Sequence, residues 1–207
     1  MSLLSGQPTH RRIGVFGGAF DPPHAAHLAL VRAAISALQL DELRIIPTGN
    51  AWHKARPLSL AQHRLAMARL AFGDLPGVVV DDRETRRNGP SYTVDTLREL
   101  KTQCPDAELF VFLGEDQARA LPTWRAWQQV LQLAIIYVAE RGDWNRSKPR
   151  FVAPKVYESR FRQLQMPAMP VSATDIRARV AAHQSLDALV SESVARYIDH
   201  HHLYQTT

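Results

Sequence analysis

The sequence is poor in cysteine and in long apolar runs. Its 207 residues include one cysteine, Cys104, which cannot form a disulfide within the chain and suits a reducing compartment. No stretch of about eighteen apolar residues could span a membrane, and residues 1–10 lack the apolar core of a secretory signal. These absences predict a cytoplasmic protein that does not cross a membrane.

Two common phosphate-binding loops are also missing. The chain contains neither the G-x-G-x-x-G pattern of dinucleotide-binding folds nor the G-x-x-x-x-G-K-[ST] pattern of P-loop proteins. The formal net charge is +5, but the basic residues are scattered along the chain rather than grouped. This excess fits a site for small polyanions. It leaves open a nucleic-acid-binding module that would use Arg11, Arg12, Arg83, Arg86 and Arg87.

The most informative stretch lies near the N-terminus. A short apolar segment, Ile13–Phe16, leads directly into Gly17 and Gly18. We expect a buried strand followed by a tight glycine turn, where a ligand can approach the main chain. A Pro-Pro pair then favours the start of a helix, which the alanine- and leucine-rich run 25–38 predicts.

Two histidines, His24 and His27, share one face at the start of this helix because they are three positions apart. Together with the N–H groups of a helix start, two imidazoles form a site for an anion such as phosphate. They could instead be ordinary surface residues, or zinc ligands together with Asp21. We favour phosphate, because prolines separate Asp21 from the histidines and no second cluster of ligands is evident.

Apolar strands alternate with amphipathic helices along the rest of the chain. The strands are too apolar to be half-exposed, so we predict an α/β fold: a doubly wound parallel sheet with helices on both faces. In such sheets ligands bind at the carboxyl ends of the strands. Strands are predicted at 13–16, 42–47, 78–80, 109–113 and 133–139, and helices at 25–38, 59–72, 94–103, 171–182 and 193–201, with a helical stretch around Trp124 and Trp127.

Several boundaries are predicted from capping and breaking residues. Ser59 to Gln62 matches a capping box, and the hydroxyls of Ser91 to Thr93 can cap the helix that follows. The arginine-rich segment 83–87 and the proline-broken segment 140–167 are predicted to be loops. We therefore divide the chain into an α/β core over 11–170 and a small helical C-terminal cap over 171–207.

A second phosphate-binding pattern opens the cap. Ser172 and Thr174 place two hydroxyls at a helix start, and Arg177 follows one turn along, where its guanidinium can grip phosphate oxygens. A plain serine N-cap beside a solvated arginine is the simpler alternative.

The two patterns together resemble a known family. The stretch from Gly17 to His27 is similar to G-G-x-F-D-P-x-H-x-G-H, and Val171 to Arg177 is similar to I-S-x-T-x-I-R. Both are motifs of Rossmann-like nucleotidyltransferases that join a nucleotide to a phosphorylated partner and release pyrophosphate. Ala26 departs from the usual glycine of this family, and its methyl group could narrow the space beside a phosphate.

Further stretches resemble the nicotinate-nucleotide adenylyltransferases within that family: Ser91-Tyr92-Thr93, Gly114-x-Asp116, Pro122-Thr123-Trp124 and Arg141-Gly142. The likeness spans almost the whole chain. It implies transfer of AMP from ATP to nicotinate mononucleotide, giving deamido-NAD and pyrophosphate in NAD biosynthesis. A pantetheine-phosphate or cytidylyl transferase is the alternative within the class, although such chains are generally shorter.

The resemblance also implies roles for individual residues. The substrate phosphate would itself be the nucleophile, Mg²⁺ would arrive with ATP, and neither a nucleic acid nor a membrane would be a partner. The oligomeric state, including a homo-oligomer, stays open. The implied catalytic residues are His24, His27, Lys54 and Arg177. Those for ATP and its phosphates are Gly17, Gly18, Ala19, Phe20, His53, Gly114, Asp116, Ser172 and Thr174, and those for nicotinate mononucleotide are Thr93, Trp124 and Arg141.

Overall fold

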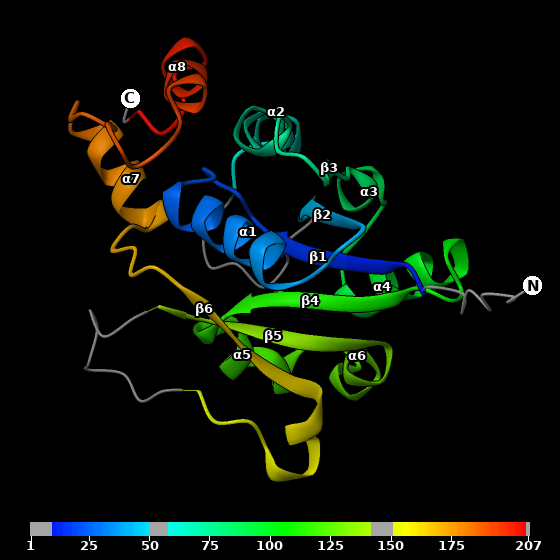
Figure 1. The fold of residues 1–207 in the computed structure, drawn as a ribbon. Helices are drawn as coiled ribbons and strands as arrows, with labels where there is room; N and C mark the ends of the chain where they lie inside the picture. Colours follow the sequence, from blue (N-terminus) through cyan, green and yellow to red (C-terminus); the bar gives the residue numbers. More distant parts are fainter. Residues whose placement is uncertain (1–9, 50–57, 142–150, 206–207) are drawn as a thin grey trace, which may run out of the picture.

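The protein is organised around one six-stranded parallel sheet, seen in a computed structural model that describes residues 10–49, 58–141 and 151–205 (Figure 1). The strand order is β3-β2-β1-β4-β5-β6. This order reverses direction between β1 and β4, as in a doubly wound fold, so the predicted fold class is confirmed. The strands are β1 (Arg12–Gly18), β2 (Glu42–Pro47), β3 (Val78–Val80), β4 (Glu108–Gly114), β5 (Ala134–Arg141) and β6 (Phe161–Met166).

Helices cover both faces of this sheet. The helices α1 (Ala25–Ala37) and α2 (Ala61–Phe72) pack on one face, and α4 (Thr93–Gln103), α5 (Glu115–Ala120) and α6 (Trp127–Leu133) on the other. No helix within the described residues is both long and apolar enough to cross a membrane. The remaining elements are α3 (Arg83–Arg86), α7 (Ala173–Ala181), α8 (Glu192–His200) and the 3-10 helices η1 (Leu121–Thr123) and η3 (Lys155–Arg160).

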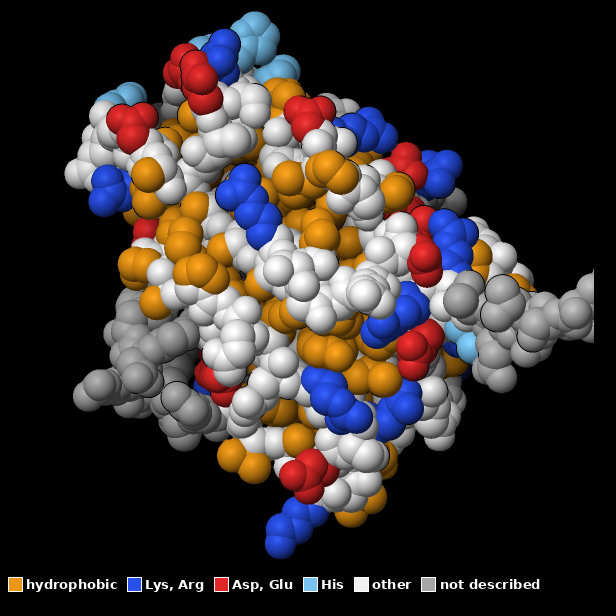
Figure 2. Space-filling model, viewed as in Figure 1, with side chains coloured by type: hydrophobic (Ala, Val, Ile, Leu, Met, Phe, Trp, Pro, Cys, Tyr) orange, Lys and Arg blue, Asp and Glu red, His pale blue; other side chains and the backbone are white. Residues whose placement is uncertain are grey.

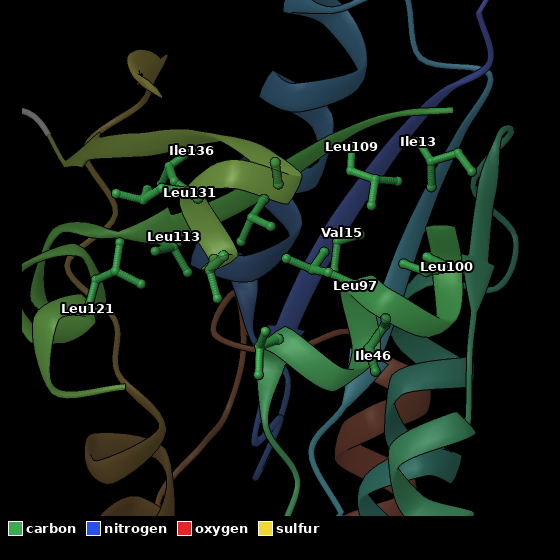
Figure 3. Close-up of a cluster of buried hydrophobic side chains, with 14 of the residues drawn as sticks. Ile13, Val15, Ile46, Leu97, Leu100, Leu109, Leu113, Leu121, Leu131 and Ile136 are labelled. Atoms are coloured by element: carbon green, nitrogen blue, oxygen red, sulfur yellow. The ribbon is translucent and has the colours of Figure 1, made fainter. Parts of the chain in front are cut away.

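The two faces explain why the central strands are apolar at every position. Side chains alternate across a strand, so Leu109 and Val111 of β4 point toward α4 and α6, whereas Phe110 and Phe112 point toward α1 and α2. Figure 3 shows the first of these cores, where Leu97 and Leu131 meet the strand residues. With both faces covered, a central strand carries no polar face.

The prediction that 140–167 is a loop was wrong for residues 140–141 and 155–166, while 142–150 lie outside the described residues. β5 continues to Arg141, and β6 pairs with it in parallel, with Ala139 beside Leu164. Of the six residues of β6, only Leu164 is buried. This edge strand is held by its main-chain ladder more than by apolar packing, so the criterion of an apolar run missed it.

Three local predictions were also wrong. α2 begins at Ala61 with Leu60 as N-cap, and Ser59 makes no side-chain cap. α4 has Tyr92 as N-cap, and Thr93 is already its first helical residue. The arginine-rich segment is the short helix α3 rather than a loop.

α7 lies beside the start of α1, near the carboxyl ends of the strands, and α8 lies beside α2 (Figure 1). Ile176 of α7 packs against Ala26 of α1, and Val194 and Ile198 of α8 pack against Met67 of α2. The division at residue 171 into core and cap stays a prediction.

Candidate active site

The point where the strand order reverses is open above two glycines. β1 ends at Gly18 and its neighbour β4 ends at Gly114. Among the described residues, a Cβ built on Gly114 would meet nothing within 4 Å, and one on Gly17 would meet only the Ile46 carbonyl oxygen at 4.0 Å. A Cβ on Gly18 would instead lie 3.1 Å from the Phe20 ring, so a ligand can approach the main chain most freely at Gly17 and Gly114, near the strand ends where doubly wound sheets bind nucleotides.

The turn after β1 differs from the predicted glycine turn. Gly17 and Gly18 keep strand geometry, and the residue in the left-handed region is Phe20, with φ of 48°. The Phe20 ring is 1% exposed and packs edge-on against Phe16 and Phe72. This side chain is therefore a core anchor that turns the main chain of residues 18–20 toward the strand ends. Its predicted contact with ATP would have to be made by the backbone.

His24 and His27 are brought together as the sequence predicts. His24 is the N-cap of α1, and the two imidazole rings stack with centroids 3.7 Å apart and planes inclined by 24°. The main-chain N–H of His24 donates to Nδ1 of His27 over 3.2 Å. Because Nδ1 accepts this bond, a neutral His27 carries its proton on Nε2. His27 thus presents a hydrogen-bond donor beside the helix N-terminus.

The second motif reaches the first through Arg177. Its Nη1 donates to the main-chain oxygen of Asp21 at 2.8 Å, and its Nη2 donates to Oγ1 of Thr174 at 3.0 Å. Ser172 is the N-cap of α7, where its hydroxyl accepts from the Asp175 N–H and donates to the Asp175 carboxylate. The simple N-cap alternative thus describes Ser172, whereas Arg177 joins α7 to the turn that precedes the histidines.

Sequence reasoning missed a buried arginine under this turn. Arg64 of α2 is 2% exposed, and its guanidinium donates four hydrogen bonds to main-chain carbonyls. Burial lowers its pKa, while the negative charge of Asp21 acts in the opposite direction. A signal was available: Arg64 lies on the same helical face as the buried Met67 and Ala68. Its acceptors are Ser59, Ala19, Thr48 and Gly49.

The predicted nicotinate segments also lie next to each other. Thr93 opens α4 and Trp124 follows η1, and both are partly buried. Between them, the guanidinium carbon of Arg125 lies 4.7 Å from the centre of the Tyr92 ring. Thr93 and Trp124 are therefore each one position from this contact. Trp127 packs against the core formed with α4 and α6.

The remaining predicted site residues lie on α5, in β5 or outside the described residues. Asp116 is exposed in the first turn of α5, where Arg119 lies 3.2 Å from its carboxylate. His53 and Lys54 lie outside the described residues, and for Arg141 only the main chain in β5 is described. A cavity of about 310 Å³ beside η1 is lined by Leu121, Trp127 and Phe161 among others, but by none of the predicted site residues whose side chains the structure describes.

A metal site and a nucleic-acid surface were the alternatives. Within residues 10–49, 58–141 and 151–205, no three His, Cys, Asp or Glu side chains form a group that could hold a metal. On the face in Figure 2, basic and acidic side chains are interspersed. The arginines proposed for nucleic acid all pair with carboxylates: Arg11 with Glu42, Arg12 with Glu108, Arg83 with Asp81, Arg86 with Asp82 and Arg87 with Glu99.

Ala26 belongs to the packing of the cap. It is 4% exposed and contacts the cluster of Val171 and Ile176. The neighbouring Ala25 N–H donates to the carbonyl of Leu189 at 2.8 Å. The methyl group of Ala26 thus fills space between α1 and α7, although the sequence suggested that it would narrow the phosphate site.

A family model and several known proteins match most of this chain. The cytidylyltransferase-like family model matches residues 15–179. A protein of Albidiferax ferrireducens named "Probable nicotinate-nucleotide adenylyltransferase" is 66% identical over 196 residues, which cover 95% of this chain and 99% of that protein. A protein of Methylibium petroleiphilum with the same name is 45% identical, over 94% of this chain and 92% of that protein.

A solved structure shares the fold. "Plasmodium falciparum nicotinic acid mononucleotide adenylyltransferase complexed with NaAD" superposes with a TM-score of 0.75 over 94% of this chain and 98% of that chain, at 19% identity. The family model and the two curated relatives carry the assignment, because each matches most of the chain. The chain belongs to the cytidylyltransferase-like family and, within it, to the nicotinate-nucleotide adenylyltransferases.

Proposed function

We propose that the cluster of His24, His27 and Arg177 carries out the reaction of this family, transfer of AMP from ATP to nicotinate mononucleotide. The observation that carries the proposal is the stacked histidine pair at the N-terminus of α1, joined through Asp21 to Arg177. Helix N–H groups, imidazoles and a guanidinium all stabilise phosphate oxygens. The products are deamido-NAD and pyrophosphate.

The chemistry asks for alignment and charge neutralisation. An oxygen of the mononucleotide phosphate attacks the α-phosphorus of ATP, and the bond to the bridging oxygen of pyrophosphate breaks. The nucleophile is already ionised, so no side chain has to remove its proton. His27 Nε2–H and the main chain of Gly17 and Gly18 would donate to the α-phosphate as negative charge builds up on it.

Arg177 would stabilise the leaving group. Its guanidinium already lies between the Asp21 carbonyl and Thr174 at the start of α7. The β- and γ-phosphates can then take hydrogen bonds from this fork and from the N–H groups of the α7 N-terminus. Lys54 and His53 would contribute further positive charge and donors.

Mg²⁺ is expected as a companion of ATP rather than as a resident ion. It would supply charge neutralisation on the leaving group. The residues at the site fit this arrangement. His24, His27 and Arg177 offer nitrogen donors that suit phosphate oxygens, whereas Mg²⁺ prefers oxygen ligands.

The second substrate would lie between α4 and η1. Trp124 offers an aromatic face for the pyridine ring, and the N-terminus of α4 at Thr93 offers N–H groups to its carboxylate. Arg141, at the end of β5, is the third residue proposed for this substrate. A carboxylate accepts hydrogen bonds from N–H donors better than an amide does, so the acid mononucleotide should be preferred.

Incubation of the protein with Mg-ATP and a panel of phosphorylated acceptors, followed by mass spectrometry of the products, tests the function. We expect deamido-NAD from nicotinate mononucleotide, with a kcat/KM at least about tenfold above that for nicotinamide mononucleotide. The panel includes CTP as donor and pantetheine phosphate as acceptor. Turnover with CTP as the donor, or with pantetheine phosphate as the acceptor, in place of ATP and nicotinate mononucleotide would contradict the assignment.

A further inference from the structure

The carboxylate of Asp21 is held by a residue from the far end of the described chain. The hydroxyl of Tyr204 donates to Oδ1 of Asp21 at 2.7 Å, across 183 positions. The main-chain N–H of Ser59 donates to Oδ2 at 3.3 Å, and the Asp21 side chain is almost wholly buried. The main-chain oxygen of the same residue accepts from Arg177.

The chain after α8 bends back to make this contact. His202 and Tyr204 both adopt left-handed backbone conformations, with φ of 50° and 64°. Such conformations are uncommon for non-glycine residues, and after a helix they are held by main-chain hydrogen bonds to its last turn. Here the N–H of Leu203 bonds to the carbonyl of Ile198, and the Tyr204 hydroxyl lies 4.0 Å from Sδ of Met67. The segment is therefore built to place one phenol against Asp21.

The phenol stays a donor under ordinary conditions. Burial and the negative charge of Asp21 raise the pKa of Tyr204 well above its usual value. A neutral hydroxyl beside a buried carboxylate gives a charge-assisted hydrogen bond. Its loss would leave one oxygen of that carboxylate without this donor, in a place that water reaches poorly.

We propose that Tyr204 is a positioning residue for adenylyl transfer. Acting through Asp21, it fixes the turn 19–24, which carries His24 and offers the carbonyl that holds Arg177. The proposal rests on the proposed function, since it names a residue that keeps both halves of that site in register. The hydroxyl of Tyr204 acts on this turn through the Asp21 carboxylate.

The substitution Tyr204→Phe tests it, because the ring is kept and only the hydroxyl is lost. Tyr197→Phe is the matched control: the Tyr197 hydroxyl bonds to Nδ1 of His63 at 3.0 Å, on the same C-terminal region but away from Asp21. We expect Tyr204→Phe to lower kcat about tenfold. Its KM for nicotinate mononucleotide should hold, since Thr93 and Trp124 belong to other elements. Tyr197→Phe should leave kcat unchanged.

A second measurement does not depend on activity. Amide hydrogen exchange of Ala19, Phe20, Asp21 and His24 reports directly on the turn. We expect faster exchange at these amides in Tyr204→Phe, while those of Tyr197→Phe match the parent protein. Exchange could be faster in Tyr204→Phe although the parent protein does not adenylylate nicotinate mononucleotide. That result would support the effect of Tyr204 on the turn and overturn the proposed function.

Two results would overturn the role of Tyr204. One is a kcat for Tyr204→Phe equal to that of the parent protein. The other is a loss of kcat that Tyr197→Phe reproduces, with exchange at the turn unchanged in both variants, because the hydroxyl would then contribute only general stability.

Discussion

The guanidinium of Arg177 donates a hydrogen bond to the main-chain oxygen of Asp21 across 156 positions of sequence, at 2.8 Å. This bond joins the start of α7 to the turn before the histidine pair. The two phosphate motifs are thus one structure, in which a movement of α7 changes the distance between the proposed leaving-group site and the α-phosphate site.

Arg177→Lys should therefore cost more than the loss of a contact to ATP. Lysine keeps the charge but cannot donate to Asp21 and Thr174 at once from a planar fork. We expect kcat/KM for ATP to fall about 10- to 100-fold in steady-state kinetics. Arg179→Lys, on the exposed side of the same helix, is the control. An unchanged kcat/KM in Arg177→Lys would mean that the positive charge alone is enough, and equal losses in the two variants would mean that the effect is not specific to Arg177.

The histidines should act on the transition state. His24→Ala and His27→Ala are each expected to lower kcat by about 100-fold or more, corresponding to about 3 kcal/mol, while ATP affinity changes far less. His200→Ala, an exposed residue at the end of α8, should leave kcat as it is. Should ATP affinity fall as steeply as kcat, the pair would serve ground-state binding instead.

A conservative pair of variants separates the two nitrogens of His27. Asn can place an acceptor where Nδ1 now takes the His24 N–H, whereas Gln can reach toward the position of Nε2. His27→Asn should keep the helix start and its thermal stability but lose the rate. A normal rate in His27→Asn would contradict the donor role of Nε2.

Trp124→Ala should raise KM for nicotinate mononucleotide about 10- to 100-fold, because stacking on an aromatic face contributes about 1–3 kcal/mol. The KM for ATP should hardly change. Trp127→Ala is the matched control, since that ring packs against the α4–α6 core and against Tyr157. Trp127→Ala should lower the melting temperature and leave KM for nicotinate mononucleotide unchanged. A Trp124→Ala defect confined to ATP would show that the pocket is assigned to the wrong substrate.

Ala26→Gly should destabilise the protein. Glycine in a helix costs about 1 kcal/mol relative to alanine, and the lost methyl group packs against Val171 and Ile176. Thermal unfolding should show a lower melting temperature, and kcat/KM for ATP should stay within a factor of about two. An improved kcat/KM with unchanged stability would revive the idea that this methyl group crowds a phosphate.

Stability should depend on pH through Asp81. Burial alone would raise its pKa, but hydrogen bonds and charges from Arg83 and Arg44 outweigh it, so the pKa of Asp81 is lowered. A lowered folded-state pKa stabilises the protein above the unfolded value of 3.8 and loses that effect as pH falls through the folded value. Asp81→Asn should cost about 2 kcal/mol at neutral pH.

Urea unfolding at several pH values checks this. The difference between the parent protein and Asp81→Asn should be constant above about pH 5 and shrink as the solution becomes more acidic than the unfolded pKa. A difference that grows on acidification would have the opposite sign and would refute the assigned direction of the pKa.

The sequence was most predictive where one physical cause dominates. Phe110 and Phe112 alternate with Leu109 and Val111 in a strand covered on both faces, so apolarity alone locates β4. β6 escaped because an edge strand buries only Leu164 and takes its stability from the β5 ladder, which leaves little trace in composition.

For the site as well, the sequence predicted what local patterns determine. The histidine spacing and the Ser-x-Thr-x-x-Arg stretch are local patterns, and the structure places both motifs at one turn. The buried face of α2 is a local pattern that points to Arg64, but it does not reveal the carbonyls of three segments that Arg64 binds. Tyr204 could not be found this way, because its partner Asp21 is far away in sequence. The roles assigned to individual site residues stay predictions.

The contacts across 156 and 183 positions also bear on how the molecule folds and opens. Closing such long loops is entropically slow, so the turn at Asp21 is completed only after most of the chain has found its place. We expect the same contacts to break first when α7 and α8 separate from the rest of the protein. In denaturant, catalytic competence would then fade while the parallel sheet is still intact, which makes the enzyme's activity an early reporter of partial unfolding.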